Sequence, residues 1–459
     1  MTTAREITKD MTRGHPGRLI FGFALPLMLG NLFQQLYTFG DTMVVGQALG
    51  VEALAALGGT EWMTFMMFGC IQGLVQGFSV VMAQYYGAAD YGLLKRSITN
   101  AVYLSLAGAV ILTISGQAMI APMLHLIHTP AEITGMSERY LRILYGGIPV
   151  TILYNLSAAV LRAIGNSKIP LQAMVIASLC NIVLDIILVF GFHAGIEGAA
   201  WATVVSQILA SVFCGVHLKN VRLGKFEKAD WLLKGEICIA QLKLGIPMGL
   251  QNIITAVGGL VVQSVVNTFG VLFLAGYTAA VKIYGLLETA ASSYGYAVST
   301  YTGQNYGAGL MDRIRKGLRA ANIIGGITAL VMSGIMVFFG RFLLSCFITG
   351  DPASVMTAIR TGYDFLLILA MFFPLLYWLY IMRACLQGMG NSILPMLSSI
   401  GQLVMRIVCA VYLTKPIGES GVFYGEVSAW LLADCMLVCS YLCHMKNKKG
   451  KCRNGGYDD

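Results

Sequence analysis

The sequence predicts an all-α polytopic membrane protein with twelve transmembrane helices in two six-helix lobes. Three observations predict this class. Only 12% of the 459 residues are charged and 57% are hydrophobic, whereas about 25% are charged in ordinary soluble proteins. Apolar stretches of about 20 residues, the length that crosses a bilayer, recur from end to end. Motifs of the first half return in the second half. A soluble globule and a disordered chain are therefore excluded.

The predicted helices follow the apolar stretches in chain order. They lie near 18–44, 53–82, 98–118, 138–160, 169–191, 197–218, 239–267, 271–300, 318–344, 360–381, 394–414 and 421–445. Runs such as 323–339 are too apolar for a soluble amphipathic helix, and they lack the period-two alternation of a membrane barrel. The first stretch contains Gln34, Gln35 and Asp41, which indicates a retained helix rather than a signal peptide.

The placement of lysine and arginine tests this topology, because these residues gather on the cytoplasmic side of membranes. With the N-terminus inside, the segments predicted outside hold only Arg139, Arg142, Arg341, Arg360 and Lys415. Lys282 and Arg406 lie within spans. The rest of the 31 basic residues, including Arg383, lie in segments predicted inside. Both termini are therefore expected in the cytoplasm. The net charge of +9 marks topology, and no nucleic-acid partner is expected.

Three motifs recur in the same order in both halves. Residues 24–31 (ALPLMLGN) match 245–252 (GIPMGLQN), 84–88 (QYYGA) match 304–308 (QNYGA), and 165–170 (GNSKIP) match 390–395 (GNSILP). We interpret the last two pairs as helix ends and helix caps. Six helices per half give both halves one orientation, related by a pseudo-twofold axis along the membrane normal. We expect an N-lobe (1–218), a cytoplasmic linker (219–238), a C-lobe (239–445) and a basic cytoplasmic tail (446–459).

Ionisable residues inside a bilayer are costly and are therefore candidates for function. Asp41, Asn181, Asp185 and Thr203 are predicted at one depth in the first half, with Asn181 and Asp185 one turn apart on one helix face. Their oxygen atoms suit Na⁺, and two neighbouring carboxylates can instead share a proton. The alternative is that each side chain makes a separate packing hydrogen bond.

Other polar residues within spans are weaker candidates. The candidates for lining a substrate cavity are Gln34, Tyr37, Tyr154 and Asn155. In the second half, Glu288 is a second-rank candidate for binding a cation or a proton. Arg406 is expected to form a structural ion pair with Asp434 or Glu426.

The motifs resemble those of the multidrug and toxic compound extrusion (MATE) family, in its prokaryotic branch. The likeness rests on Pro26, Asn31, Asp41, Gln84, Gly87, Gly165 and Pro170 in order, and it covers residues 15–445. It implies a V-shaped pair of six-helix lobes that exports organic cations and hydrophobic drugs. It also implies that Asp41, Asn181, Asp185 and Thr203 bind the coupling ion, with Tyr37 and Tyr140 nearby.

One departure from the family pattern narrows the choice of coupling site. Some branches use acidic residues on helices 7 and 10. Here the seventh predicted helix has none, and the tenth has only Asp364 near its outer end. A second-half coupling site of that type is therefore not expected.

The expected function is secondary active antiport across the cell membrane. Amphipathic, often cationic compounds would leave in exchange for H⁺ or Na⁺ by alternating access, and both ions stay open because one oxygen cluster serves either. A lipid or lipid-linked oligosaccharide flippase is the alternative, although only Lys282 and Arg406 could supply the basic cavity that it needs. The six histidines are dispersed, so no enzyme is expected. The chain is expected to be a monomer in the lipid bilayer, to act on small molecules and to need no cofactor besides the coupling ion.

Overall fold

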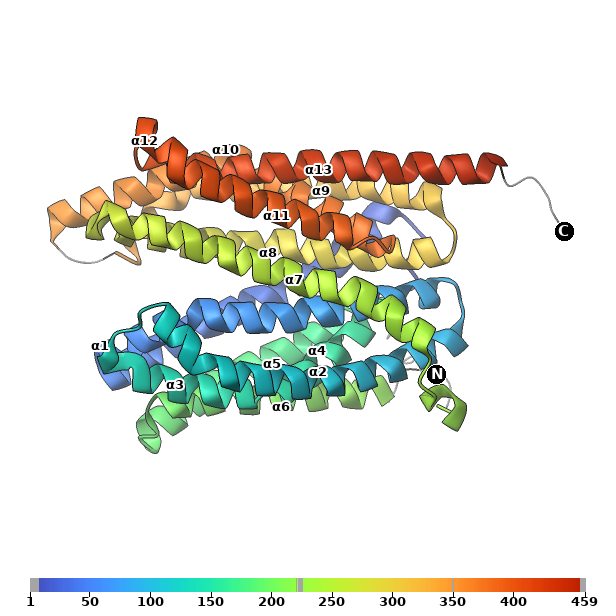
Figure 1. Ribbon diagram of the computed structural model, residues 1–459, viewed down its shortest axis with the longest axis horizontal. Coiled ribbons are helices and arrows are strands. Elements are labelled where there is room, and N and C mark those ends of the chain that lie inside the picture. The colour runs from blue at the N-terminus through green and yellow to red at the C-terminus, as the bar shows by residue number, and fades with distance from the viewer. Residues whose placement is uncertain (1–7, 220, 222–225, 349–350, 455–459) are drawn as a thin grey trace. The chain divides into compact units, whose positions relative to one another are not determined.

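The computed structural model describes residues 8–219, 221, 226–348 and 351–454, and these are helical almost throughout, with no β-strand among them. The helices, shown in Figure 1, are α1 (Pro16–Gly87), α2 (Tyr91–Leu126), α3 (Ala131–Gly146), α4 (Ile148–Ala163), α5 (Lys168–Asp185), α6 (Gly195–Lys219), α7 (Gly235–Val266), α8 (Val271–Gly307), α9 (Met311–Ser345), α10 (Pro352–Gly388), α11 (Ile393–Val408), α12 (Thr414–Ile417) and α13 (Ser420–Asn454). Two π-helical turns, η1 (Ile186–Gly191) and η4 (Cys409–Leu413), continue α5 and α11, and η2 (Lys228–Trp231) and η3 (Asn267–Phe269) are 3₁₀ turns.

Eleven helices of the described residues are long and apolar enough to cross a membrane, and the bent pair α3 and α4 supplies a twelfth span. The long α1 contains two of them, Pro16–Gly50 and Glu52–Gly87, because the backbone leaves helical geometry at Gly50 (φ 83°, ψ −168°). The predicted all-α fold with twelve spans is confirmed.

The predicted single helix near 138–160 is wrong in detail. The structure has two helices there, α3 and α4, which meet at Gly147 with a bend of 47°. Proline occupies the first turn of α4 at Pro149. Because proline has no N–H to donate to the preceding turn, the helix changes direction at this point.

Most helices run past their predicted spans. For example, α10 ends at Gly388 rather than near residue 381. About 20 residues cross the hydrocarbon, so a longer helix continues beyond it while keeping its hydrogen bonds. Arg383, predicted in the inside segment that follows the tenth span, accordingly lies within α10, and it is only 7% exposed.

The chain forms two compact units, which are described separately. The first comprises Met1–Ile253 and Gly303–Arg313, and the second comprises Ile254–Thr302 and Ile314–Asp459. The predicted lobe boundaries stay a prediction. Part of the predicted linker, residues 220 and 222–225, lies outside the described residues, as do the side chains of the predicted tail 446–459.

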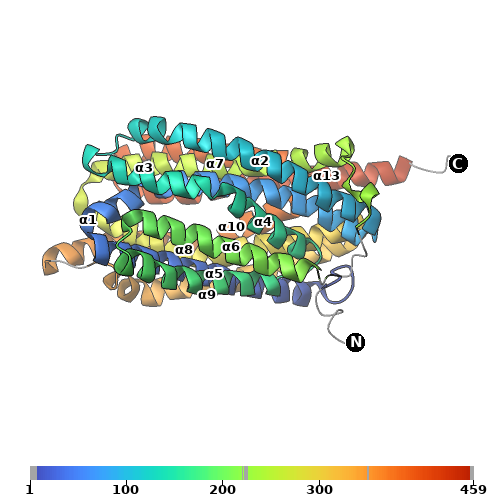
Figure 2. The same cartoon turned by 90° about the horizontal axis from the view of Figure 1, so that it is seen from below.

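In the first unit, α5 packs against α1 and α6, and α4 packs against the same two helices. Figure 2 shows α5 beside α6. A further contact brings α1 to the start of α7 through glycines spaced four apart on both helices. A Cβ atom on Gly73 would collide with the backbone of Met248, and one on Gly77 with the backbone of Gly245. Small residues at this spacing let membrane helices approach backbone to backbone.

Two of the repeated motifs contact each other within the first unit. A Cβ on Gly87 would collide with the backbone of Gln304, and one on Gly307 with the backbone of Gln84. Gly87 ends α1 and Gly307 ends α8, as the sequence predicts.

The other repeated loop is confirmed as a helix cap. Asn166 accepts hydrogen bonds from the backbone N–H groups of Lys168 (3.0 Å) and Ile169 (3.1 Å). Asn391 accepts one from Leu394 (3.3 Å) in the second half. Both asparagines satisfy backbone donors at a helix start, where no carbonyl of the helix can reach them.

Residues 8–14 form an N-terminal strap that lies against the same motifs. Met11 is fully buried, and its N–H donates to Gln304 Oε1 (2.8 Å) while its carbonyl accepts from Asn305 (3.1 Å). Arg313 donates to the carbonyls of Met11 (3.3 Å) and Gly14 (3.0 Å). Lys9 N–H donates to the carbonyl of Ile164 (3.1 Å). The strap is thus held through its backbone.

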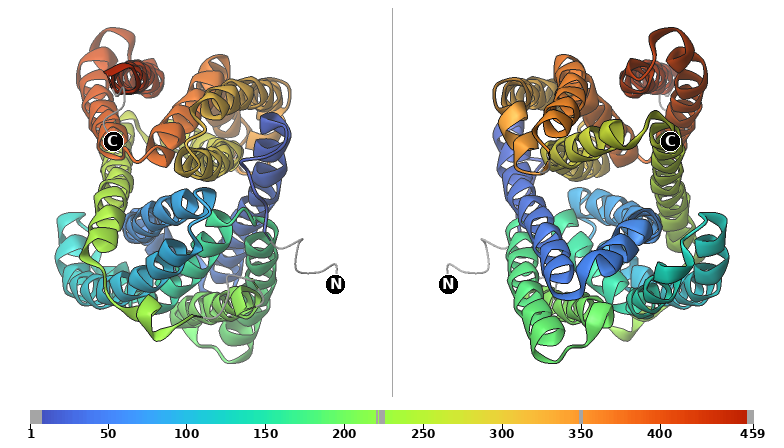
Figure 3. Two further views of the ribbon diagram at one scale, coloured as in Figure 1. Left: turned by 90° about the vertical axis from the view of Figure 1, so that its right-hand side faces the viewer. Right: turned by 90° about the vertical axis from the view of Figure 1, so that its left-hand side faces the viewer.

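In the second unit, α13 packs against α10 and α11. Ser333 on α9 donates to the carbonyl of Ala370 on α10 (2.7 Å), and Tyr377 on α10 donates to the carbonyl of Leu287 on α8 (3.3 Å). Figure 3 looks along the helices, so that those of each unit are seen end-on. The polar contacts lie between apolar helices and therefore fix which faces meet.

Candidate ion-binding site

Two acidic side chains from different helices meet inside the first unit. Asp41 on α1 is 8% exposed and Asp185, the last residue of α5, is fully buried. Their carboxyl groups lie within hydrogen-bonding reach of each other. We call Asp41 and Asp185 the carboxylate pair. The predicted convergence of these two residues therefore holds in the structure.

Asn181 and Thr203 complete one side of the carboxylate pair. Asn181 lies one turn before Asp185 on α5 and is 1% exposed. With its amide oriented to satisfy both neighbours, its nitrogen donates to Asp185 Oδ2 (3.1 Å) and its oxygen accepts from the N–H of Thr203 (3.2 Å). The Thr203 hydroxyl, on α6, lies 3.4 Å from the Asn181 amide and donates to the carbonyl of Ala199 (3.2 Å).

The carboxylate pair has oxygen atoms left over. Asp41 Oδ1 and Asp185 Oδ1 are buried and have no hydrogen-bond partner among the described residues. No described lysine or arginine forms an ion pair with either carboxylate. Two negative charges at this range repel strongly in a medium of low dielectric constant, and an unpaired buried charge is costly. The arrangement therefore calls for a proton or a cation.

Two tyrosines lie close to the carboxylate pair. Tyr37, one turn before Asp41 on α1, and Tyr140 on α3 are both within electrostatic reach of Asp41 and Asp185. Tyr140 is 8% exposed and packs in an apolar cluster with Leu144 and Ile196. The structure thus brings together both tyrosines that the family resemblance implies.

The remaining cavity candidates lie elsewhere in the first unit. Gln34 is exposed on α1. Tyr154 packs against the apolar cluster around Leu156, and Asn155 donates to the carbonyl of Thr151 in its own helix (2.8 Å). Their role in lining a substrate cavity stays a prediction.

The helix geometry changes directly after Asp185. The π-helical turn η1 begins at Ile186, and the corresponding helix of the second half has its own π turn, η4, from Cys409. A π turn holds one extra residue, and such turns are frequent at functional sites. The two halves of the chain thus share a π turn at corresponding helices, although no repeated sequence motif indicates it.

The second unit contains a polar cluster of a different composition. Tyr380 donates to Glu288 Oε1 (2.9 Å), so the half-buried Glu288 carboxylate has a protein donor. Arg406 pairs with Glu426, whose Oε1 also accepts from Trp430 (3.2 Å). The expected structural ion pair of Arg406 is confirmed, with Glu426 as its partner.

Arg383 and Asp434 extend this cluster, and sequence reasoning missed the first of them. Arg383 donates to Ser399 (3.1 Å) and Gln402 (3.3 Å), and Asp434, 6% exposed, has no hydrogen-bond partner for either carboxylate oxygen among the described residues. A signal for this cluster exists. Ser399, Gln402 and Arg406 follow one another at intervals of three and four, which places three polar side chains on one face of α11.

Metal-binding clusters of the usual kind are not found in the described part of the chain. No three His, Cys, Asp or Glu side chains gather there into a group that could hold a metal ion. The carboxylate pair and the Thr203 hydroxyl offer hard oxygen donors, which suit Na⁺ better than a transition metal.

Comparisons with known proteins agree with this architecture. The profile of the MatE family matches residues 26–187 and 247–412. The probable multidrug resistance protein YpnP of Bacillus subtilis (strain 168) is 28% identical over 433 residues, which covers 94% of this chain and 96% of that protein.

Solved structures show the same fold. A transporter of the MOP superfamily from Pyrococcus furiosus Vc1 (DSM3638), described as having a binding pocket of reverse polarity that suggests a different function, superposes with a TM-score of 0.90 at 25% identity and covers 96% of this chain and 98% of that one. The outward-facing conformation of a multidrug resistance MATE family transporter gives a TM-score of 0.89 at 24% identity, with 95% and 98% covered.

The family profile matches both halves of a chain that is built from membrane-spanning helices. The family consists of transporters, so the prediction that this chain is not an enzyme is confirmed. The protein is a multi-pass membrane protein, and it belongs to the MatE family.

Proposed function

We propose that this protein is an antiporter that exports amphipathic, often cationic compounds in exchange for Na⁺ or H⁺. The observation that carries the proposal is the carboxylate pair: two buried acids in mutual contact, each with an oxygen that no described group satisfies. Such a pair gains stability when a cation or a proton enters and loses it when the ion leaves. The relative named as a multidrug resistance protein supports drug export.

In the proposed cycle, ion binding and substrate release alternate. The ion reaches Asp41 and Asp185 from outside, neutralises their repulsion and thereby favours closure of the outer side by alternating access. Thr203 adds a hydroxyl oxygen for Na⁺ and Asn181 orients the Asp185 carboxylate by donating to its Oδ2, while a proton needs the carboxylates alone. Tyr37 and Tyr140 hold the two acids in an apolar surrounding that strengthens their response to charge.

We also propose where the transporter lies in the cell and in what oligomeric state it works. The predicted segregation of basic residues supports a place in the cell membrane with both termini in the cytoplasm. The repeat supports two six-helix lobes, and the chain is proposed to work as a monomer.

The test uses everted membrane vesicles that contain the full chain. A fluorescent organic cation is offered outside, and either Na⁺ or acid is concentrated in the lumen. Wild type is expected to drive uptake with one of the two gradients, which identifies the ion. Asp41→Asn and Asp185→Asn are expected to abolish gradient-driven uptake, because each removes one charge that the ion must neutralise.

A matched control is Asp364→Asn, which removes a carboxylate that is exposed on α10, and it is expected to transport normally. Glu288→Gln is also expected to transport, because Glu288 already accepts a hydrogen bond from Tyr380. Undiminished uptake by Asp41→Asn would remove the basis of the proposal, and loss of uptake in Glu288→Gln alone would move the coupling site to the second unit.

A further inference from the structure

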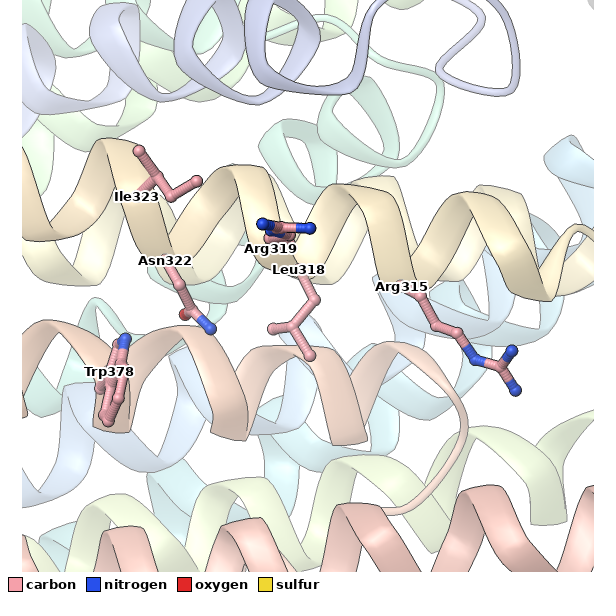
Figure 4. A pocket seen from close by; sticks show the side chains of 6 residues that line it. All are labelled: Arg315, Leu318, Arg319, Asn322, Ile323 and Trp378. Atoms are coloured by element: carbon pink, nitrogen blue, oxygen red, sulfur yellow. The ribbon is translucent and has the colours of Figure 1, made fainter.

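A groove runs between α9 and α10 in the second unit. It has a volume of about 510 Å³ and is lined by Arg315, Leu318, Arg319, Asn322, Ile323 and Trp378. In Figure 4, Leu318 and Asn322 project from α9 toward α10, where Trp378 stands, and Arg315 lies nearer the start of α9. None of these lining residues belongs to the candidate ion site, so the groove needs its own explanation.

The lining chemistry suits a phosphate group. Arg315 and Arg319 are four residues apart and thus share one face of α9, where both are exposed. A planar guanidinium donates two parallel hydrogen bonds to phosphate oxygens, and the Asn322 amide adds a further polar group one turn on. The lining contains no carboxylate that would repel an anion.

The position of the groove in the helices suits a lipid. Both arginines lie within the first three turns of α9, and Trp378 lies three turns before the end of α10, so the groove is near one end of two membrane-spanning helices. Tryptophan gathers at the boundary between headgroups and hydrocarbon. From Ile323 (55% exposed) at the edge of the groove, Ile327 (58%) and Leu330 (64%) continue an exposed apolar stripe along α9. A stripe of this kind matches an acyl chain.

We propose that this groove binds an anionic phospholipid. The lipid phosphate lies between Arg315 and Arg319, its glycerol region packs on Trp378, and one acyl chain follows Ile323, Ile327 and Leu330. Basic pockets between transmembrane helices on the cytoplasmic side bind lipid headgroups in this manner. The inference is independent of the coupling ion and of the transported compound.

Native mass spectrometry of the purified full chain in mild detergent tests this site. Phosphatidylglycerol and phosphatidylcholine with identical acyl chains are titrated separately. Wild type is expected to bind the anionic lipid more tightly. A juxtamembrane basic residue is expected to contribute about a fivefold preference, so Arg315→Gln/Arg319→Gln should weaken phosphatidylglycerol binding about thirtyfold and leave phosphatidylcholine binding unchanged.

The matched control, Lys316→Gln/Arg341→Gln, removes the same charge from exposed positions of α9 outside the groove, and it should bind like wild type. The charge-preserving variant Arg315→Lys/Arg319→Lys should keep most of the preference and shows that loss in the glutamine variant does not come from misfolding. Equal binding by the glutamine variant and wild type would overturn the site. So would an equal loss in the control, or displacement of the lipid by soluble glycerol phosphate at the same concentration.

Discussion

At the proposed ion site, the only described acceptor for the Thr203 hydroxyl is a carbonyl of its own helix, that of Ala199. Thr203→Val keeps the shape of the side chain but removes this oxygen. With Na⁺ as the coupling ion, loss of an interaction with a charged group costs about 1.5–3 kcal/mol, so the Na⁺ concentration for half-maximal transport should rise about ten- to a hundredfold. Thr203→Ser keeps the hydroxyl and should behave like wild type. An unchanged ion dependence in Thr203→Val would exclude the hydroxyl from the site.

The ion pair of Arg406 with Glu426 makes a prediction about stability. The two side chains are 13% and 16% exposed. Arg406→Met leaves the buried Glu426 charge unpaired and should destabilise the protein by about 3–5 kcal/mol. Arg406→Met/Glu426→Gln removes both charges and keeps an acceptor for Trp430, so most of the stability should return. Thermal unfolding of the purified variants in detergent measures both, and equal midpoints for the two variants would contradict a structural pair.

The spacing of individual residues could predict part of the candidate ion site. The sequence placed Asp41, Asn181, Asp185 and Thr203 at one depth, because helix direction and length determine depth. Depth does not determine how a helix is rotated about its axis, so the contact between Asp41 and Asp185 needed the structure. Arg383 was missed for a different reason: a basic residue a few positions from the end of an apolar stretch has the sequence pattern of a loop residue, although its helix continues past it.

At the scale of helices, the glycine contact between α1 and α7 predicts a strong position effect. Gly77→Ala would place a methyl group against the backbone of Gly245, and overpacking of this kind costs about 1–3 kcal/mol. Gly59→Ala on the same helix is the control, because a Cβ there meets nothing within 4 Å and alanine favours the helix by about 0.5–1 kcal/mol. Gly77→Ala should lower the midpoint of thermal unfolding, and Gly59→Ala should keep or raise it. Equal unfolding midpoints for Gly77→Ala and Gly59→Ala would contradict a close backbone contact between α1 and α7.

The transmembrane helices could be predicted because a segment that crosses the hydrocarbon must consist mainly of apolar residues, and composition is visible in the sequence. Two features of these helices could not be predicted. The π turns η1 and η4 each accommodate one extra residue. One more residue in a long apolar segment does not change its hydropathy in a recognisable way. The bend between α3 and α4 does have a sequence signal, Gly147 followed by Pro149, but proline within a span also occurs in continuous helices such as α2 at Pro122.

At the scale of the whole molecule, the N-terminal strap makes a prediction about local opening. Arg313 donates to the carbonyls of Met11 and Gly14, which hold the backbone on both sides of the exposed Arg13. Trypsin must free this backbone before it can cut there. Arg313→Gln removes charged hydrogen bonds worth about 1.5–3 kcal/mol and should accelerate cleavage after Arg13 at least about tenfold. Lys316→Gln is the control, and equal cleavage rates in the two variants would contradict the role of Arg313.

The repeat could be recognised from three motifs, yet their arrangement could not. Sequence similarity shows that QYYGA and QNYGA are equivalent, but it does not show that Gly87 and Gly307 each make room for the opposite motif. Nor does it show that Gln304 and Asn305 hold the strap at Met11. Two motifs can be recognised as equivalent by comparing their sequences alone. Whether they touch depends on how all the helices between them pack.

The strap also sets an order of events during synthesis. Met11 and its partner Gln304 are 293 residues apart. At a translation rate of about 5–20 residues per second, Met11 waits roughly 15–60 s after its own synthesis before Gln304 exists. Until then only the early contact of Lys9 with Ile164 can form, and a nascent chain that stops short of residue 304 lacks the groups that hold Met11.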